Sequence, residues 1–312
     1  MSFPIPTFRS CGLDTWSCYW HESTLTWPLP LFPGHSPADG TDGGLTCAGA
    51  QRILDVCNGG VMNLRRLLLT LEGRHCPFGC SYCFATFKAY SRPLSLEAVE
   101  RDPSQLEGID VVYPACDIDL FACSDAIDVL ERTAALGRSI SVSTKAAISA
   151  ERTKRIASIA KRMPRGSVLK IGASFSTKKR LAEIEPRTAD YASRIRTLRF
   201  LSECGVTTSL VLKPVRAEIP ASEYCEIIRD AELFTRMVLV GEEYLDPDGP
   251  DVSAETRAVT WLPSSPRWPV RATPEQLRVI ADYADSRGLE CFSSDLQLMQ
   301  SAIDRVTPVH VG

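Results

Sequence analysis

The sequence predicts an α/β fold: a partial (β/α)6 TIM-type barrel with an N-terminal extension and a C-terminal helical segment. From residue 66 onward, short apolar runs alternate with amphipathic stretches, which is typical of βα units around a parallel sheet. Six apolar runs precede residue 245, and a partial barrel is the simplest closure of six such units. The chain has 312 residues and 44% apolar content, which is enough to bury the core of one domain of this kind.

The strands and helices are predicted from the spacing of apolar residues. Each apolar run is short, as buried strands are, and the predicted strands are residues 67–71, 109–114, 139–143, 168–174, 207–212 and 237–241. Between them, apolar residues recur at helical spacing in residues 125–136, 149–162, 191–204 and 222–233. The loops after the strands of such a barrel gather side chains around one cavity, so we expect the functional residues there.

The two ends of the chain differ in pattern from the barrel. Residues 1–64 contain six prolines and a loop rich in Gly and Asp, which interrupt regular structure. Residues 246–250 predict a loop, and Thr273 and Pro274 then open a predicted helix that ends at residue 287. We therefore divide the chain into a cysteine-containing extension at residues 1–64, the partial barrel at 65–245 and a C-terminal extension at 246–312.

The charge pattern limits the partners of the protein. The net charge of −3 argues against sequence-independent binding to DNA, because such binding needs many cationic side chains. Residues 131–200 nevertheless carry 17 Lys or Arg against 5 Asp or Glu. This segment is either a phosphate-facing surface or the solvated outside of the barrel helices. A small-molecule substrate is therefore favoured, and DNA stays open as a partner.

The amino terminus and the hydropathy predict a soluble, cytoplasmic protein with no membrane partner. Residues 1–12 have no basic stretch followed by an apolar one, and no apolar run approaches membrane-spanning length. In that reducing compartment, the twelve cysteines are not expected to pair as disulfides. Some of them are therefore expected to bind metal or to take part in chemistry.

Three of the cysteines lie on one short loop directly after the first predicted strand. The loop reads Cys76-Pro77-Phe78-Gly79-Cys80-Ser81-Tyr82-Cys83, a C-x3-C-x2-C spacing. Three thiolates at this spacing can hold three corners of a cubane cluster, and the fourth iron then lacks a protein ligand in the loop. An open metal position is typical of a catalytic site. Zinc is the alternative, but it would need a fourth ligand, and His75 is adjacent to Cys76, where joint ligation is awkward.

This loop resembles the cluster loop of the radical S-adenosylmethionine (SAM) superfamily. Further short matches resemble its spore photoproduct lyase branch, which includes DNA repair photolyase-like relatives. These matches are Ser143-Thr144-Lys145, Gly172-Ala173-Ser174-Phe175-Ser176, Glu185-Pro186-Arg187 and Val211-Leu212-Lys213-Pro214. The resemblance covers roughly residues 66 to 245. It implies a [4Fe-4S] cluster on Cys76, Cys80 and Cys83.

The resemblance also implies a shared first reaction step and a set of SAM-binding residues. SAM chelates the open iron, and an electron from the cluster breaks the sulfonium bond to give a 5′-deoxyadenosyl radical that abstracts a substrate hydrogen. The implied electron donor is a reductant such as flavodoxin or ferredoxin. Lys145 and Ser174 would hold the SAM carboxylate, which needs a cation and a hydroxyl donor, although a surface lysine also explains Lys145. Tyr82 would lie near the adenine, and the implied cofactor set also includes Ser176 and Arg187.

Two further cysteines follow the second predicted strand. In the resembled branch, a cysteine in this region returns a hydrogen atom to the substrate radical. Cys123, in Cys-Ser-Asp, is the nearer match, and Cys116 is the second candidate. A thiol suits this task because its S–H group is weak and polarizable, but a buried free cysteine is also common in protein cores.

The N-terminal extension contains four more cysteines: Cys11, Cys18, Cys47 and Cys57. Four is the number of ligands for a second [4Fe-4S] cluster. The intervening spacings of six, twenty-eight and nine residues match no tight ligand loop, so scattered core thiols are the alternative. An auxiliary cluster would relay electrons, bind substrate or donate sulfur. The last three cysteines, Cys204, Cys225 and Cys291, are predicted to be core residues.

Other catalytic chemistries find little support in the sequence. No phosphate-binding loop, dinucleotide-binding turn or zinc-protease motif is found, and the chain has only four histidines. The favoured hypothesis is a radical SAM enzyme acting on a small nucleoside-like, nucleotide-like or other metabolite, including one of natural-product biosynthesis. The alternatives are repair of a DNA lesion, sulfur insertion with the auxiliary cluster, and a non-catalytic iron-sulfur regulator.

Overall fold

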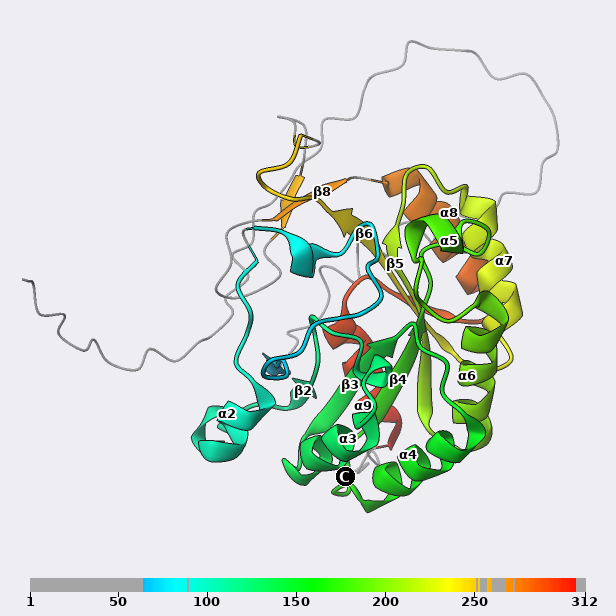
Figure 1. The fold of residues 1–312 in the computed structure, drawn as a ribbon. Coiled ribbons are helices and arrows are strands. Elements are labelled where there is room, and N and C mark those ends of the chain that lie inside the picture. Colours follow the sequence, from blue (N-terminus) through cyan, green and yellow to red (C-terminus); the bar gives the residue numbers. More distant parts are fainter. Residues whose placement is uncertain are drawn as a thin grey trace, which may run out of the picture.

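A curled parallel sheet forms the centre of the protein. The computed structural model describes residues 64–88, 90–250, 252, 257–259, 268–271 and 273–306. Six strands pair in parallel and in sequence order: β1 (Arg66–Leu68), β2 (Val111–Tyr113), β3 (Ser139–Thr144), β4 (Leu169–Ser174), β5 (Thr207–Val215) and β6 (Met237–Tyr244). Figure 1 shows that they curve around a common centre. Because all six correspond to predicted strands, the predicted partial barrel is confirmed.

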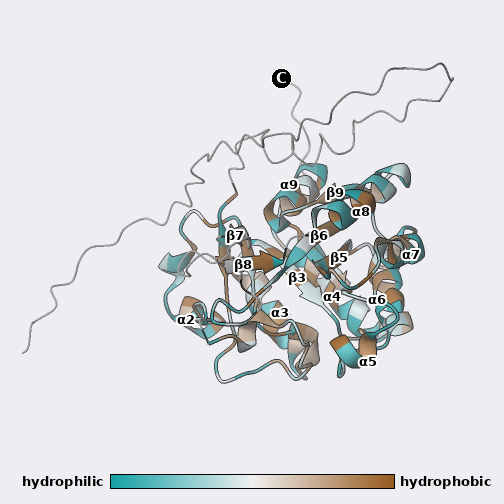
Figure 2. Ribbon diagram, turned by 90° about the horizontal axis from the view of Figure 1, so that it is seen from above, coloured by the Kyte–Doolittle hydropathy of each residue, from teal (hydrophilic) through white to brown (hydrophobic). Residues whose placement is uncertain are grey.

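Helices cover the outer face of this half-barrel. The main ones are α3 (Ala126–Ala135), α4 (Ala150–Arg162), α6 (Tyr191–Glu203) and α7 (Ala221–Ala231), each within two residues of a predicted helix. α4 begins where the Ser149 hydroxyl accepts a hydrogen bond from the Arg152 amide, and Asp190 caps α6 through the Ser193 amide. In the view from above, these helices lie around the strands and carry both hydrophilic and hydrophobic residues (Figure 2).

The helices bury their apolar sides against the sheet. Leu130 of α3 and Ile156 of α4 are fully buried with Ile140 of β3, and Ile228 of α7 is fully buried with Leu212 of β5. Full burial of such a side chain stabilises the fold by about 1.5–3 kcal/mol. This layer fixes the strands, and thereby the positions of the loops that follow them.

The C-terminal part of the chain completes the sheet and closes one end of its inner face. β9 (Glu290–Phe292) pairs in parallel with β6, and β8 (Trp268–Arg271) pairs antiparallel with β6 and with β7 (Arg257–Val259). α8 (Pro274–Ser286) confirms the predicted helix. α9 (Asp295–Val306) packs its apolar residues against inward-facing residues of the sheet such as Val211 and Leu239. The sequence analysis predicted neither β9 nor α9.

The remaining elements are short. They are α2 (Leu96–Arg101), α5 (Leu181–Ile184) and the 3-10 turns η1 (Phe84–Thr86), η2 (Pro103–Leu106) and η3 (Leu120–Ala122). η1 and α5 lie in the loops after β1 and β4, at the end of the half-barrel where the strands finish. We call this end the mouth, and the space inside the sheet the lumen. Across the described ranges, every helix is too short or too polar to cross a membrane.

Candidate functional site

The cysteine loop, residues 76–83, follows β1 at the mouth. Cys76, Cys80 and Cys83 are half-buried free thiols. The pKa of Cys80 is raised to about 11, chiefly by burial; Lys145 opposes the rise, and the neighbouring Glu185, Cys83 and Cys76 contribute to it. Burial, together with Cys76, also raises the pKa of Cys83. The three thiols are therefore close enough to act on one another electrostatically.

This donor set fits an iron-sulfur cluster. A bound cluster carries the positive charge that keeps neighbouring buried thiols deprotonated. Among the described residues, no three His, Cys, Asp or Glu side chains converge as ligands of a single metal ion. A cubane does not require such convergence, because each thiolate binds a different iron. The spread of three thiols over one loop is therefore compatible with three corners of a [4Fe-4S] cluster.

The backbone of the cysteine loop turns at Gly79. Its φ of +61° lies in the left-handed region, which L side chains rarely adopt. A Cβ at this position would also collide with the guanidinium of Arg187. Arg187, which the resemblance implied as a SAM-binding residue, thus lies directly against the cysteine loop.

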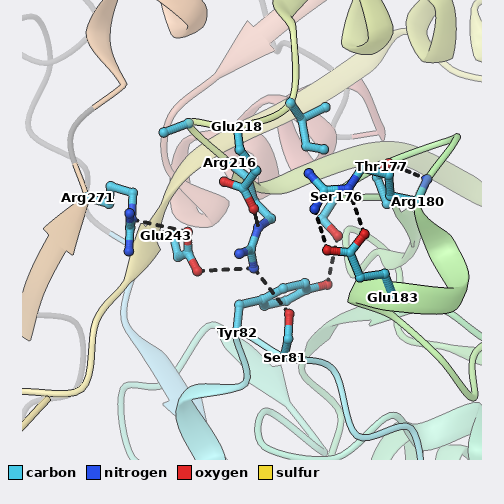
Figure 3. Close-up of polar contacts among 12 residues, drawn as sticks. Ser81, Tyr82, Ser176, Thr177, Arg180, Glu183, Arg216, Glu218, Glu243 and Arg271 are labelled. Carbon is cyan, nitrogen blue, oxygen red and sulfur yellow. Dashed lines mark hydrogen bonds and ion pairs between the residues drawn. The ribbon is translucent and has the colours of Figure 1, made fainter. Parts of the chain in front are cut away.

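The loop is held across the mouth by groups that follow β4 and β5. The Ser81 amide donates to the Ile184 carbonyl at 3.0 Å, and the Arg216 guanidinium donates to the Ser81 hydroxyl at 3.4 Å. Arg216 also lies over the Tyr82 ring, 5.6 Å from its centroid, as Figure 3 shows. Segments far apart in the sequence therefore fix the position of the loop.

A buried carboxylate, Glu185, lies at the centre of the contacts around Tyr82. The Tyr82 hydroxyl donates to Glu185 Oε1, and the Ser176 hydroxyl donates to the same atom at 2.6 Å. Arg194 pairs with Glu185 Oε2 at 2.6 Å, and both side chains are fully buried. Burial favours the neutral acid, but Lys145 and Arg194 outweigh it and hold the pKa of Glu185 below its usual value.

Tyr82 is enclosed at its hydroxyl end, although its ring is only half-buried. Burial and the negative charge of Glu185 raise the pKa of Tyr82 well above its usual value. The phenol therefore stays protonated and keeps donating to the carboxylate. This bond fixes the ring between the cysteine loop and the end of β4.

Lys145 and Ser174 come together from neighbouring strand ends. The Lys145 ammonium donates to the Ser174 hydroxyl at 3.0 Å and lies 5.7 Å from the centroid of the Tyr82 ring. Asp119 fixes the backbone there, because it accepts hydrogen bonds from the Lys145 amide at 2.5 Å and the Thr144 hydroxyl at 2.7 Å. The structure thus gathers four of the implied SAM-binding residues: Tyr82, Lys145, Ser174 and Ser176.

The two candidate hydrogen donors lie in the segment between β2 and α3. Cys123 lies beside the Arg74 guanidinium, which forms a bidentate pair with Asp125 at 2.5 and 2.6 Å. Arg74 is two residues before Cys76, so this pair connects the Cys123 segment to the cysteine loop. Cys116 lies beside Tyr90, and burial raises the pKa of Cys116 to about 12. The catalytic roles of both thiols stay predictions.

The other seven cysteines fall into two groups. Cys11, Cys18, Cys47 and Cys57, and with them the predicted auxiliary cluster, lie outside the described residues. Of the three cysteines predicted to be core residues, Cys204 and Cys291 pack against the two outer apolar layers, whereas Cys225 is half-buried on α7.

The sequence analysis missed several residues that organise the site, namely Asp119, Arg194, Arg216 and Glu243. Glu243 is buried between Arg216, at 3.1 Å, and Arg271, at 3.6 Å (Figure 3). Glu185 was noted only as part of a short match. The sequence contains only a weak signal for these residues. Each is a charged residue near a strand end, and a charge that is buried there needs a partner.

Comparison with known proteins supports the fold. No protein-family model matches the chain, and no curated protein sequence matches it. Among solved structures, it is similar to a single-residue mutant of spore photoproduct lyase at a TM-score of 0.52 and 12% identity, over 73% of this chain and 82% of that one. A spore photoproduct lyase variant with bound AdoMet and dinucleoside spore photoproduct matches at 0.51 and 12%, over 73% and 76%. The predicted resemblance is therefore confirmed at the level of the fold, which this chain shares with spore photoproduct lyase.

Proposed function

We propose that the protein is a radical SAM enzyme that abstracts hydrogen from a small nucleoside-like or nucleotide-like metabolite. One observation carries the proposal: three interacting thiols lie on a loop at the mouth, next to a lysine and a hydroxyl suited to an amino-acid carboxylate. The fold shared with spore photoproduct lyase supports it. When bound, the cluster would supply the electron that cleaves SAM to a 5′-deoxyadenosyl radical.

In this proposal the residues of the chain bind and orient the two cofactors. Cys76, Cys80 and Cys83 hold the cluster. The Lys145 ammonium and the Ser174 hydroxyl donate to the SAM carboxylate, since a buried carboxylate requires such donors. Tyr82, fixed by Glu185, offers a flat face beside Lys145 for the adenosyl part. Ser176 and Arg187 position Tyr82 and the cysteine loop.

Cys123 is proposed to return a hydrogen atom to the substrate radical at the end of the reaction. Its S–H bond breaks as the substrate C–H bond forms, and an electron from the external reductant and a proton from solvent convert the remaining thiyl radical back to the thiol. Two observations support this role: Cys123 follows β2 along the chain, and it lies beside Arg74, two residues before Cys76. Cys116 is the second candidate. A Cys123→Ala variant should still cleave SAM but should release altered products, because the hydrogen return is lost.

Repair of a DNA lesion is the second candidate function. The structural neighbour with a bound dinucleoside photoproduct favours it, as does the cationic segment at residues 131–200. A repair enzyme should bind duplex DNA with strong salt dependence, whereas an enzyme for a small metabolite should show almost none. Fluorescence anisotropy with a labelled duplex over a range of salt concentrations separates the two.

The proposed chemistry is tested by anaerobic reconstitution with iron and sulfide, followed by SAM and dithionite. We expect 5′-deoxyadenosine from the wild-type protein and none from the Cys76→Ala/Cys80→Ala/Cys83→Ala variant. Cys225→Ala is the matched control, because Cys225 is a half-buried thiol on α7, far along the chain from the cysteine loop. An intact reduced cluster that yields no 5′-deoxyadenosine would point to a regulatory protein instead.

A further inference from the structure

The lumen just below the mouth is lined by small residues. Ser143 of β3 faces inward, because Val142 beside it is buried among the outer helices, and yet Ser143 is exposed. Gly172 of β4 is in register with Ser143, and a Cβ there would meet Ser209 and Val211 at 2.6 Å. Ser209 and Val211 of β5 therefore take the space beside Gly172, and Ser143 next to it stays exposed on the inner face.

Lys213 of β5 is a long side chain nearer the mouth, four residues after Ser209, which pairs with Gly172. Its aliphatic part lies over Gly241 of β6, where a Cβ would be 2.9 Å from Lys213 Cδ. The φ of Gly241 is not in the left-handed region, so the reason for glycine here is the space that Lys213 occupies. Gly241 thus lets the lysine extend along the inner face of the sheet.

The Lys213 ammonium has no anionic partner in the described part of the chain. Its contact there is the Tyr244 ring, whose centroid is 5.6 Å away. The carboxylate that follows Gly241 on the same face, Glu243, is already shared by Arg216 and Arg271. A half-buried ammonium without a counter-charge favours an anionic ligand.

Three aromatic rings extend from this lysine across the mouth. Tyr244 meets Phe84 edge-on at 6.2 Å between centroids, and Phe84 meets Tyr90 at 5.5 Å. Four strands separate β1 from β6, so the contact between Phe84 after β1 and Tyr244 of β6 bridges the mouth. We call these three rings the aromatic arc. It places flat, apolar surface next to a cation.

We propose that the lumen beside the aromatic arc binds a planar ring carrying a phosphate, with the phosphate at Lys213 and the ring against the arc. A nucleoside monophosphate is the simplest ligand of this class. Lysine is a common phosphate ligand, and aromatic side chains bind bases by stacking. This inference rests on the proposed function and specifies its substrate class. Lys145 and Ser174 remain assigned to SAM.

Binding by holoenzyme with SAM bound tests the inference. The probes are the common nucleoside monophosphates, their unphosphorylated nucleosides and inorganic phosphate, measured by isothermal titration calorimetry. We expect at least one monophosphate to bind about tenfold more tightly than its nucleoside, the usual effect of one charged hydrogen bond. If no monophosphate is preferred over its nucleoside, the inference is wrong.

Variants of the lysine and of its neighbour sharpen this test. Lys213→Gln should abolish the preference for the phosphate, Lys213→Arg should retain most of it, and Gly241→Ala should weaken it by displacing the lysine. Lys161→Gln, an exposed lysine of α4, is the control and should change nothing. SAM affinity should be the same in all variants. A Lys213→Gln protein that loses SAM affinity but keeps the phosphate preference would assign this lysine to SAM and overturn the inference.

The two proposals fail in distinguishable ways. Reductive cleavage of SAM in the absence of substrate reports the proposed function alone, because it requires the cluster and SAM but not Lys213. A protein that forms 5′-deoxyadenosine without preferring any monophosphate contradicts only the substrate class. A protein that prefers a monophosphate but never cleaves SAM contradicts only the radical SAM activity.

Discussion

The two sides of the mouth differ in whether their charged side chains have partners on the chain. Around the cysteine loop, the buried carboxylates have partners on the chain: Glu185 meets Arg194 and Tyr82, and Asp119 meets the Lys145 amide. Across the lumen, the Lys213 ammonium lies over the Tyr244 ring and has no anionic partner among the described residues. Side chains that are paired in this way keep fixed positions before any ligand binds, and such preorganisation suits cofactor binding. A cation without a counter-charge on the chain is stabilised most by a ligand that supplies an anionic group.

The buried Glu185–Arg194 pair should give the largest effect on stability. Glu185→Gln leaves Arg194 buried without a counter-charge, which typically costs about 3–5 kcal/mol of unfolding free energy. Urea denaturation measures the change. Glu183→Gln is the matched control, because Glu183 is an exposed glutamate paired with Arg180, and it should leave the midpoint unchanged. Equal effects of the two substitutions would mean that Glu185 does not organise the site.

Replacement of Lys145 should weaken SAM binding most among the cofactor residues. Loss of one hydrogen bond to a charged group costs about 1.5–3 kcal/mol, or about tenfold to a hundredfold in affinity. Lys145→Met, which keeps the apolar part of the side chain, should show this loss in equilibrium dialysis with labelled SAM. Lys161→Met should bind SAM as the wild type does. Unchanged affinity of Lys145→Met would remove Lys145 from the site.

Two glycines with left-handed backbones, Gly73 before the cysteine loop and Gly79 within it, distinguish the effect of backbone strain from that of the Arg187 contact. Gly79→Ala and Gly73→Ala each incur the left-handed backbone cost, about 1–2 kcal/mol. Only Gly79 has a neighbour, Arg187, where the new methyl group would lie, whereas Gly73 has nothing within 4 Å. Gly79→Ala should therefore bind less iron after reconstitution than Gly73→Ala. Iron contents that fall equally would show that the Arg187 contact is unimportant.

The Tyr82 hydroxyl should have a smaller effect. Tyr82→Phe removes one donor from Glu185, which retains Ser176 and Arg194, so the expected loss is about 0.5–1.5 kcal/mol of stability. Thermal unfolding measures it. Phe78→Leu, a change in a buried ring of the cysteine loop, is the comparison for loss of apolar packing. A larger loss for Tyr82→Phe than for Glu185→Gln would contradict the central place given to the carboxylate.

Acid should remove the contribution of Glu185 to stability. Its folded pKa is lowered, so the stability it provides is complete above the ordinary glutamate pKa of about 4.3 and is lost as the pH falls through the folded value. The difference in unfolding free energy between the wild type and Glu185→Gln should therefore be constant near neutral pH and should shrink below pH ~4. Urea midpoints between pH 7 and pH 3 test this. A difference that grows on acidification would have the wrong sign.

The sequence predicted most of the half-barrel because its βα units leave a periodic apolar pattern. It did not predict β9, which has only three residues and becomes a strand by pairing with β6. α9 was missed as well, although it buries Leu298, Met299 and Ala302 at helical spacing. The cysteine loop was found because its spacing is local. The partners Glu185 and Arg194, or Arg216 and Glu243, come from different elements, and only the fold brings them together.

The central claim is that three thiols of one loop hold a cluster with one iron open to SAM. Electron paramagnetic resonance of the reduced, reconstituted protein tests this directly. We expect a [4Fe-4S] signal that changes when SAM is added and that is lost in the Cys76→Ala/Cys80→Ala/Cys83→Ala variant. A signal that SAM leaves unchanged, or protein that binds zinc and no iron at these cysteines, would contradict it.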